Sequence, residues 1–176
     1  MTGKTPKGDT MSQEWFDKRA LLFEQYTLKC LMKQTRRDFA VWLTFRPEDA
    51  GNPTTEKIRQ ALEKSGIQYL MTFNGTMFTE DRAVWHNEDL PERLAKTLPI
   101  VKEFIGEAEY VYETNLDSDD MVRNDFSEVV QTKEFRKKGA LYCQKGYCYN
   151  TEGRVAEWHN PTSNQNYTIM FPYEEY

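Results

Sequence analysis

The sequence predicts an α/β fold, a single domain in which helices flank a mostly parallel sheet. Runs rich in β-branched and aromatic residues alternate with segments of helical periodicity, in the order strand, helix, strand, helix, strand. That order is typical of right-handed crossovers in a parallel sheet, and 176 residues suffice for one domain with a substantial core. Residues 1–12 are polar and lack periodicity, which predicts a disordered leader before a domain over 13–176.

Apolar side chains at helical spacing predict four helices. These run from Phe16 to about Gln34, from a Thr cap near residue 55 to Ser65-Gly66, from an Asp89 cap to Gly106, and from Phe126 to Gly139. We expect Pro99 to kink the third of them, because proline removes a hydrogen bond from the interior of a helix.

Three predicted strands precede those helices or lie between them. They are "FAVWLTF" (39–45), "IQYLMTF" (67–73) and "EYVYETNL" (109–116). After Gly139 the pattern changes, and the rest of the chain predicts the short strands of a hairpin or mixed edge region, with a turn over 150–153. The connection of some fifteen residues after 73 contains Trp85 and His86, and loops of this length are often functional.

The composition excludes several classes of protein. A net charge of -5 and a pI near 5.2 argue against binding to nucleic acid or to an anionic membrane. No apolar stretch approaches the ~20 residues of a membrane span, and the N-terminus has no signal-peptide core, so we predict a cytoplasmic protein. The three cysteines form no C-x-x-C pair, which predicts reduced thiols rather than a disulfide framework or a zinc site.

Asp117, Asp119 and Asp120 follow the third predicted strand directly. In an open α/β sheet, ligands bind at the carboxyl ends of the strands, so this position favours a binding site. Crowded carboxylates raise each other's pKa unless a cation compensates, and carboxylate oxygens suit Mg²⁺ or Mn²⁺. Such an ion keeps open positions for a diphosphate and can neutralise its leaving-group charge, as in glycosyl transfer from a nucleotide sugar.

A purely structural interpretation of these carboxylates is also open. Asp119 or Asp120 can cap the helix that follows, with the other side chains solvated. An EF-hand is excluded, because the register from Asp117 places Met121 at the fifth ligand position and Val122 where the turn glycine belongs.

Three blocks of the sequence, spread over about residues 15–173, resemble a known family. They are "WFDKRALLFEQYTLKCLMKQTRRDFAVWLTF", "NLDSDDMVRNDFSEVVQ", and "KGYCYN" followed by Asn160-Pro161 and "YTIMF". In these blocks the chain is similar to a rhamnosyltransferase family of GT-A-type glycosyltransferases with bacterial and viral members. Within the second block, Asp117-Ser118-Asp119 corresponds to the family's D-x-D metal motif.

The resemblance implies a GT-A-like domain that transfers a hexosyl residue, such as rhamnosyl, from a nucleotide-diphosphate sugar to a glycan acceptor with the help of Mn²⁺ or Mg²⁺. It implies that Asp119 ligates the metal together with Asp117, and that Asp117 and Asp120 also assist through the ribose or the metal's waters. Arg19 lies in the first block and can reach the donor diphosphate, although an arginine on an amphipathic helix is more often simply solvated.

Further candidates come from the residues after the metal motif. An inverting transfer needs a carboxylate base, for which Glu157, Glu174 and Glu175 are candidates, with a surface charge as the alternative for each. His86 and His159 are weighed as metal ligands, and the structural interpretation is preferred for both. We expect the large aromatic side chains to pack in the core rather than to stack on a sugar or base; they are Trp85, Trp158, Tyr147 and Tyr149.

Two departures from the family pattern support a second interpretation. The sequence predicts no strand before the helix at Trp15, whereas GT-A domains begin with a strand, and it ends soon after "FPYEEY". The alternative is therefore a degenerate or truncated glycosyltransferase domain that serves as a binding or interaction module, or as part of a longer enzyme with a companion domain or chain.

Overall fold

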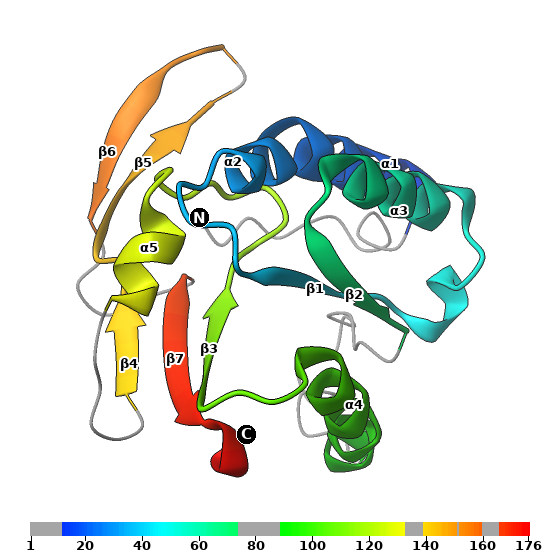
Figure 1. The fold of residues 1–176 in the computed structure, drawn as a ribbon. Helices are drawn as coiled ribbons and strands as arrows, with labels where there is room; N and C mark the ends of the chain where they lie inside the picture. The colour runs from blue at the N-terminus through cyan, green and yellow to red at the C-terminus, as the bar shows by residue number, and fades with distance from the viewer. Residues whose placement is uncertain (1–11, 74–88, 133–138, 151, 160–165) are drawn as a thin grey trace.

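The computed structural model describes residues 12–73, 89–132, 139–150, 152–159 and 166–176 (Figure 1). The predicted leader, apart from Ser12, lies outside these residues. The helices are α1 (Gln13–Leu22), the π-helical η2 (Phe23–Leu28), α2 (Lys29–Met32), the 3-10 turn η3 (Pro47–Asp49), α3 (Pro53–Ser65), α4 (Asp89–Ile105), α5 (Phe126–Gln131) and the 3-10 turn η5 (Tyr173–Glu175). The strands are β1 (Ala40–Thr44), β2 (Gln68–Thr72), β3 (Tyr110–Asn115), β4 (Gly139–Tyr142), β5 (Lys145–Tyr149), β6 (Val155–His159) and β7 (Tyr167–Pro172).

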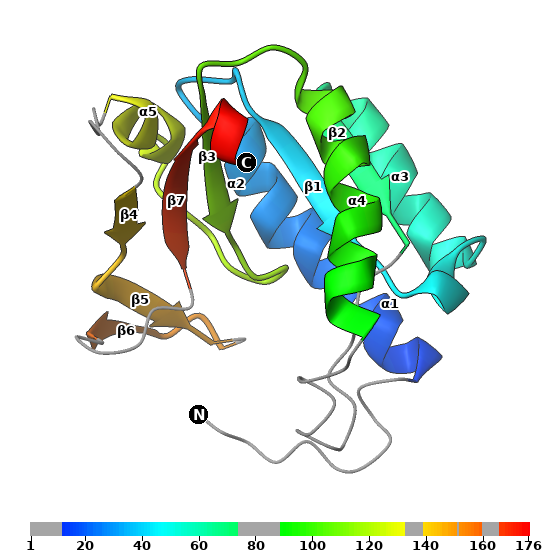
Figure 2. The same cartoon turned by 90° about the horizontal axis from the view of Figure 1, so that it is seen from below.

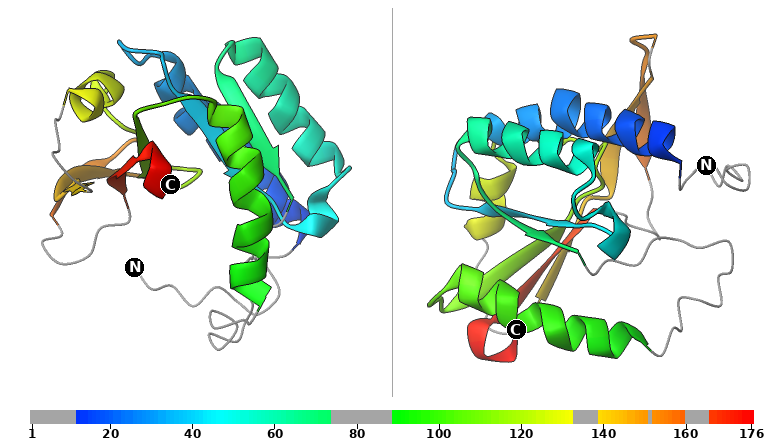
Figure 3. Two further views of the ribbon diagram at one scale, coloured as in Figure 1. Left: turned by 60° about the horizontal axis from the view of Figure 1, so that its bottom comes forward. Right: turned by 90° about the vertical axis from the view of Figure 1, so that its right-hand side faces the viewer.

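The helices form layers on the two faces of the β1–β2 pair. Elements α1, η2 and α2 form one continuous helix, which lies beside α3 over one face, while α4 covers the opposite face (Figures 1 and 3). The π-helical turn in the middle of the first helix was not foreseen from the sequence; such turns are rare and often occur at functional sites.

Local signals explain where the helices begin and end. The Ser12 side chain accepts a hydrogen bond from the Trp15 amide (3.1 Å), and the Asn52 side chain accepts one from Thr54 (2.8 Å), so both helices start on a capping residue. Gly66 ends α3 with φ of 68°, a conformation that glycine adopts without a steric penalty. The end at Gly66 confirms the predicted second helix, but its N-cap is Asn52 and not the predicted threonine, because the Asn52 side chain reaches the Thr54 amide.

The described strands form three separate sheets. β1 and β2 pair in parallel, β7 pairs antiparallel with both β3 and β4, and β5 pairs antiparallel with β6. The predicted mostly parallel sheet is therefore wrong for these residues, which form a mixed α/β structure. The reason is that the C-terminal strand returns next to β3 in the opposite direction, so only the β1–β2 pair of the described strands keeps the parallel crossover.

β1 and β3 are edge strands of two different sheets within the described part of the chain. Residues of both strands line the same pocket, although no hydrogen-bonded ladder joins the two strands (Figure 2). The described residues therefore leave the sheet interrupted between its N-terminal and C-terminal halves.

The main core lies between the first helix, α3 and the β1–β2 pair. Its buried members are Phe16, Phe23, Leu28, Ile58, Leu62 and Ile67. Leu62 is fully buried. This core fixes the helix that carries Arg19 and Thr27 against the sheet, and so gives the site below a rigid support.

Helix α4 has the predicted bounds, whereas the described part of α5 is shorter than predicted. α4 runs through Pro99 and ends before Gly106, whose φ is 71°. The described part of α5 ends at Gln131, well before the expected end at Gly139, and residues 133–138 lie outside the described part. No helix among the described residues is long and apolar enough to cross a bilayer.

Candidate functional site

The three aspartates lie in a loop, residues 116–125, that leaves the carboxyl end of β3. The Asp120 amide donates a hydrogen bond to the Asp117 carbonyl oxygen (3.0 Å), which closes a turn around the acidic residues. The first helix fixes the same turn from the side, because the Thr27 hydroxyl donates to the Asp120 carbonyl oxygen (2.9 Å). The predicted position at a strand's carboxyl end is thus the observed one.

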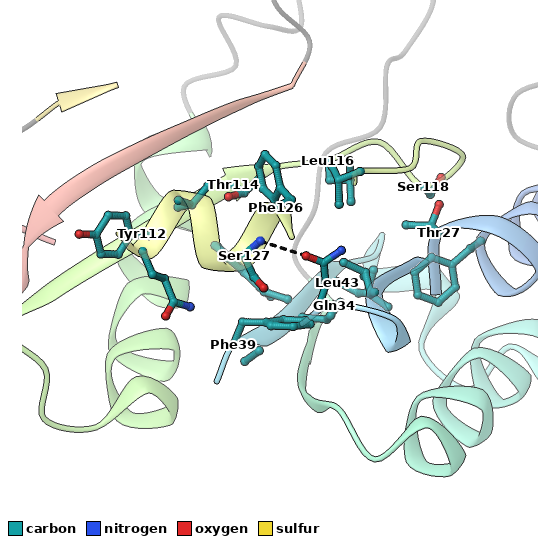
Figure 4. Close-up of a pocket in the computed structure, with 18 residues that line it drawn as sticks. Thr27, Gln34, Phe39, Leu43, Tyr112, Thr114, Leu116, Ser118, Phe126 and Ser127 are labelled. Carbon is teal, nitrogen blue, oxygen red and sulfur yellow. Dashed lines mark hydrogen bonds between the residues drawn. The ribbon is translucent and has the colours of Figure 1, made fainter. Parts of the chain in front are cut away.

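Gln34 ties the second half of this loop to the end of the first helix. Its side-chain amide nitrogen donates to the Arg123 carbonyl oxygen (2.7 Å), and its amide oxygen accepts from the Ser127 backbone N–H (2.9 Å; Figure 4). Only 4% of Gln34 is exposed, so both hydrogen bonds are shielded from water. The Cys30 thiol adds a further contact to the backbone of Val122 (3.2 and 3.3 Å).

Arg19 reaches across from α1 to the acidic loop. Its Nη1 donates to Asp119 Oδ2 (2.6 Å) and its Nη2 donates to Ser118 Oγ (2.8 Å), while the guanidinium carbon lies 5.8 Å from the centre of the Trp15 ring. This geometry contradicts the interpretation of Arg19 as part of a merely solvated helix face. Two residues of the predicted site, 100 positions apart in the chain, are in direct contact.

Asn166 is a site residue that the sequence did not single out. Its Nδ2 donates to Asp120 Oδ2 (2.9 Å), so it orients the carboxylate from the β7 side of the loop. Its Oδ1 is buried and has no hydrogen-bond partner in the described structure. Exchanging the two amide atoms would set an oxygen against the carboxylate, so the contact with Asp120 fixes this orientation. Nothing in the local sequence pattern predicts such a long-range contact.

The electrostatics of the loop match the predicted crowding of charge. Burial by surrounding protein atoms, together with the nearby carboxylates of Asp120 and Asp119, raises the pKa of Asp117, and the Arg19 guanidinium opposes this rise. Asp117 keeps part of its side chain exposed, which leaves it accessible to a ligand. A cation at this carboxylate would relieve the repulsion that raises its pKa.

The structure contradicts the helix-cap interpretation of the cluster. α5 begins at Phe126, its N-cap position is Asp125, and neither Asp119 nor Asp120 lies next to it. The Asp125 side chain itself makes no capping hydrogen bond. Asp119 instead accepts from Arg19, and Asp120 accepts from Asn166.

The carboxylate oxygens of the loop suit a hard divalent cation, but the loop offers few of them. In the part of the chain that the structure describes, no three carboxylate, histidine or cysteine side chains are arranged as a metal-binding group. The loop therefore fits an ion held by one or two carboxylates, which is how Mg²⁺ is often bound when phosphate and water supply the remaining ligands.

A pocket of about 210 Å³ opens beside the acidic loop. Its lining includes Phe39 and Leu43 on one side, Tyr112 and Thr114 on the other, and Ser118 at the loop (Figure 4). None of the lining residues carries a formal charge. The pocket thus offers aromatic and hydroxyl groups next to a loop that offers the charges.

The family model described as "Putative rhamnosyl transferase" matches residues 10–171 of the chain. The chain belongs to this family. The match confirms the resemblance drawn from the three sequence blocks and assigns the chain at the coarse level to sugar transferases, which act on a sugar donor and an acceptor. No curated protein and no solved structure matches the chain significantly.

The carboxylates predicted as base of the transferase lie in different places. Glu157 lies on β6, in the hairpin whose Tyr149 contacts the first helix beside the acidic loop. Glu174 lies in η5, which follows β7 where Pro172 pairs with Tyr110, at the start of β3. The six residues of β3 span roughly 20 Å, so Glu174 and the acidic loop lie near opposite ends of this strand.

The aromatic candidates are mostly not in the core. Tyr147 and Tyr149 are 74% and 54% exposed, which corrects the expectation that they pack in the interior. The reason is that the β5–β6 hairpin forms a two-stranded sheet of its own. Trp158 is half-buried and His159 is exposed on the same hairpin, whereas Trp85 and His86 lie outside the described residues.

Proposed function

We propose that this chain is a metal-dependent glycosyltransferase that moves a hexosyl residue, most simply rhamnosyl, from a nucleotide-diphosphate sugar to a glycan acceptor. Membership of the family supports the transferase class. The observation that carries the finer proposal is the contact of Arg19 with Asp119 and Ser118. This contact brings together the Arg19 guanidinium, which can bind phosphate, and Asp119, the predicted metal ligand. Both lie at the carboxyl end of a strand.

The acidic loop supplies the groups that hold the donor. Asp119 and Asp117 would hold Mn²⁺ or Mg²⁺, whose chemistry when bound is to neutralise charge on the leaving diphosphate. Asp120, which Asn166 orients, would accept hydrogen bonds from the donor ribose or from water on the ion. The uncharged pocket beside Ser118 suits the nucleobase rather than the diphosphate.

Arg19 has two possible partners in this proposal. Without donor, its guanidinium forms hydrogen bonds with Asp119 and Ser118. With donor bound, the same planar group turns to the diphosphate oxygens, which it can bind by two parallel hydrogen bonds. The nearby Trp15 ring supports the guanidinium in both arrangements.

Glu157 is better placed than Glu174 to act as the base. Its hairpin contacts the first helix through Tyr149 and Tyr26, whereas Glu174 lies near the other end of β3. In the proposed reaction Glu157 accepts the proton of the acceptor hydroxyl as that oxygen attacks the anomeric carbon and the nucleoside diphosphate leaves.

Isothermal titration calorimetry with UDP-, GDP- and dTDP-sugars, each with and without Mn²⁺, tests the proposal. We expect one of these donors to bind in a Mn²⁺-dependent manner, and the Asp119→Asn variant to lose that dependence. Asp125→Asn is the matched control, because Asp125 lies in the same loop but pairs with Arg123. Failure of every donor to bind, or unchanged binding by Asp119→Asn, would contradict the proposal.

The interrupted sheet favours a second proposal, that the chain works as part of a longer enzyme or with a companion domain or chain. β1 and β3 are edge strands of different described sheets and line one uncharged pocket, and an edge strand can pair with a strand from another segment or chain. Hydrogen exchange tests this proposal. Amides of β1 and β3 should exchange faster than those of β7, which is paired on both sides, and equal protection of all three strands in the isolated chain would refute it.

A further inference from the structure

The Arg19 guanidinium occupies the carboxylate that is predicted to hold the metal. Its Nη1 donates to Asp119 Oδ2 (2.6 Å) and its Nη2 donates to Ser118 Oγ (2.8 Å), so both terminal nitrogens are engaged with the acidic loop. The Trp15 ring, whose centre lies 5.8 Å from the guanidinium carbon, supports this position. In the donor-free chain the predicted metal ligand is therefore already paired with a positive charge.

The acidic loop is held in place by other contacts, which do not involve Arg19. Side chains of the first helix bond the backbone of the loop at three points, and all three side chains are buried: Thr27 bonds Asp120, Cys30 bonds Val122 and Gln34 bonds Arg123. The two hydrogen bonds from Arg19 end on side-chain oxygens instead. They therefore affect the availability of the Asp119 carboxylate more than the path of the loop.

A divalent cation competes with Arg19 for Asp119. A carboxylate shared between a guanidinium and a divalent ion would bring two positive groups within a few ångströms of each other, where they repel strongly. The side chains of Arg19 and Asp119 are 29% and 39% exposed, so solvent weakens this repulsion without removing it. An ion that arrives without a diphosphate must therefore displace the guanidinium, and this requirement lowers its affinity for the site.

A diphosphate removes this competition. Its oxygens can accept both of the hydrogen bonds that Arg19 otherwise donates to Asp119 and Ser118. The Asp119 carboxylate is then free for the ion, and the negative charge of the diphosphate offsets the charges of both cations. Donor and ion thus each favour the binding of the other.

We propose that Arg19 blocks the metal site in the donor-free chain: it occupies Asp119 until a diphosphate takes over its hydrogen bonds, so that the divalent cation and the donor bind cooperatively. This inference rests on the proposed glycosyltransferase function and names a regulation of its site. By linkage, the factor by which the donor strengthens binding of the ion equals the factor by which the ion strengthens binding of the donor.

Titration of the whole chain with Mn²⁺ alone tests this inference, with free Mn²⁺ measured by its electron paramagnetic resonance signal. We expect Arg19→Ala to bind Mn²⁺ about 10-fold more tightly than wild type, because Asp119 is no longer occupied. This gain should disappear in the double variant Arg19→Ala/Asp119→Asn. A second titration in the presence of saturating nucleotide sugar should strengthen Mn²⁺ binding by a larger factor in wild type than in Arg19→Ala.

Arg123→Ala is the matched control. It removes a positive charge from the acidic loop itself but leaves the contact between Arg19 and Asp119 in place, because the Arg123 side chain pairs with Asp125. Since the Arg123 side chain is 84% exposed, Arg123→Ala should bind Mn²⁺ within about 2-fold of wild type.

The other outcomes separate this inference from the proposed function. If Arg19→Ala binds Mn²⁺ alone no more tightly than wild type, the inference is overturned, while Mn²⁺-dependent binding of a nucleotide sugar by wild type would leave the proposed function standing. An equal gain in Arg123→Ala would also overturn the inference, because the effect would then come from the charge of the loop and not from release of Asp119. Failure of every nucleotide sugar to bind would remove the proposed function and, with it, the cooperativity inferred here.

Discussion

Arg19 Nη1 and Asp119 Oδ2 lie 2.6 Å apart, although 100 positions separate the two residues in the chain. Their side chains are 29% and 39% exposed, and ion pairs at such positions contribute only about 0 to 1 kcal/mol to stability. The ion pair is therefore better explained by the position it gives the Arg19 guanidinium than by its contribution to the stability of the fold. It holds a guanidinium over the loop where a diphosphate is proposed to bind.

Replacing Arg19 should weaken donor binding more than it weakens the fold. In Arg19→Ala we expect the affinity for the nucleotide sugar to fall about 10- to 100-fold, the range for loss of a charge-assisted hydrogen bond. Arg19→Lys should be intermediate, because an ammonium group cannot form two parallel hydrogen bonds to phosphate. Titration calorimetry measures the effect, with Lys18→Ala as the control, since Lys18 pairs with Glu14 on the exposed side of α1. Equal affinities of Arg19→Ala and wild type would show that Arg19 does not bind the donor.

Asp117→Asn should make the metal-free chain more stable at neutral pH. The folded-state pKa of Asp117 is raised, so the folded protein holds this proton more tightly, and stability falls as pH rises from the ordinary carboxyl pKa through the raised one. The variant lacks this loss, so its melting temperature should exceed that of wild type by about 1 to 3 °C at pH 7 and by less at pH 3.5. Mn²⁺ should stabilise wild type more than the variant. A difference independent of pH would show that the pKa of Asp117 is not raised in the folded chain.

The acidic loop was predictable from the sequence because its signal is local. Three aspartates directly behind a strand-like run define both the element and its charge, and the structure places them where the pattern predicts. The contacts of the loop with Arg19 and Asn166 depend on tertiary packing over distances of 100 and 46 residues. Arg19 entered the prediction through the family resemblance alone, and Asn166 did not enter it.

The sheet was predicted less well than the helices. Helices such as α3 carry their boundary signals in the sequence, at Asn52 and at Gly66. Strand order has no such local marker, since "YTIMF" is equally apolar whether it pairs parallel or antiparallel. For the same reason the exposure of Tyr147 could not be foreseen, because it follows from β5 and β6 forming a separate sheet.

Gln34→Ala should both destabilise the chain and loosen the acidic loop. The change leaves the Arg123 carbonyl and the Ser127 N–H without their buried partner, at a cost of about 1 to 3 kcal/mol for each unsatisfied group. Thermal denaturation should show a melting temperature lower by about 4 to 20 °C. Gln60→Ala is the control, because Gln60 is exposed and bonds only Glu56 along its own helix in the described structure. If the two variants melt alike, Gln34 does not anchor the loop.

Asn166→Asp should turn a supporting hydrogen bond into a repulsive contact. Asn166 donates to Asp120 Oδ2 at 2.9 Å, and a carboxylate in its place would face another carboxylate at that distance. Because paired carboxylates have raised pKa values, the variant should lose stability relative to wild type as pH rises from about 4 to 7. Asn124→Asp adds the same charge to an exposed position of the loop and should have little effect. A bound cation would cancel the repulsion, so saturating Mn²⁺ should restore most of the melting temperature of Asn166→Asp. If Mn²⁺ instead shifts the melting temperatures of Asn166→Asp and Asn124→Asp equally, the ion does not lie close to Asp120, and the place of Asp120 in the proposed metal and donor site would have to be abandoned.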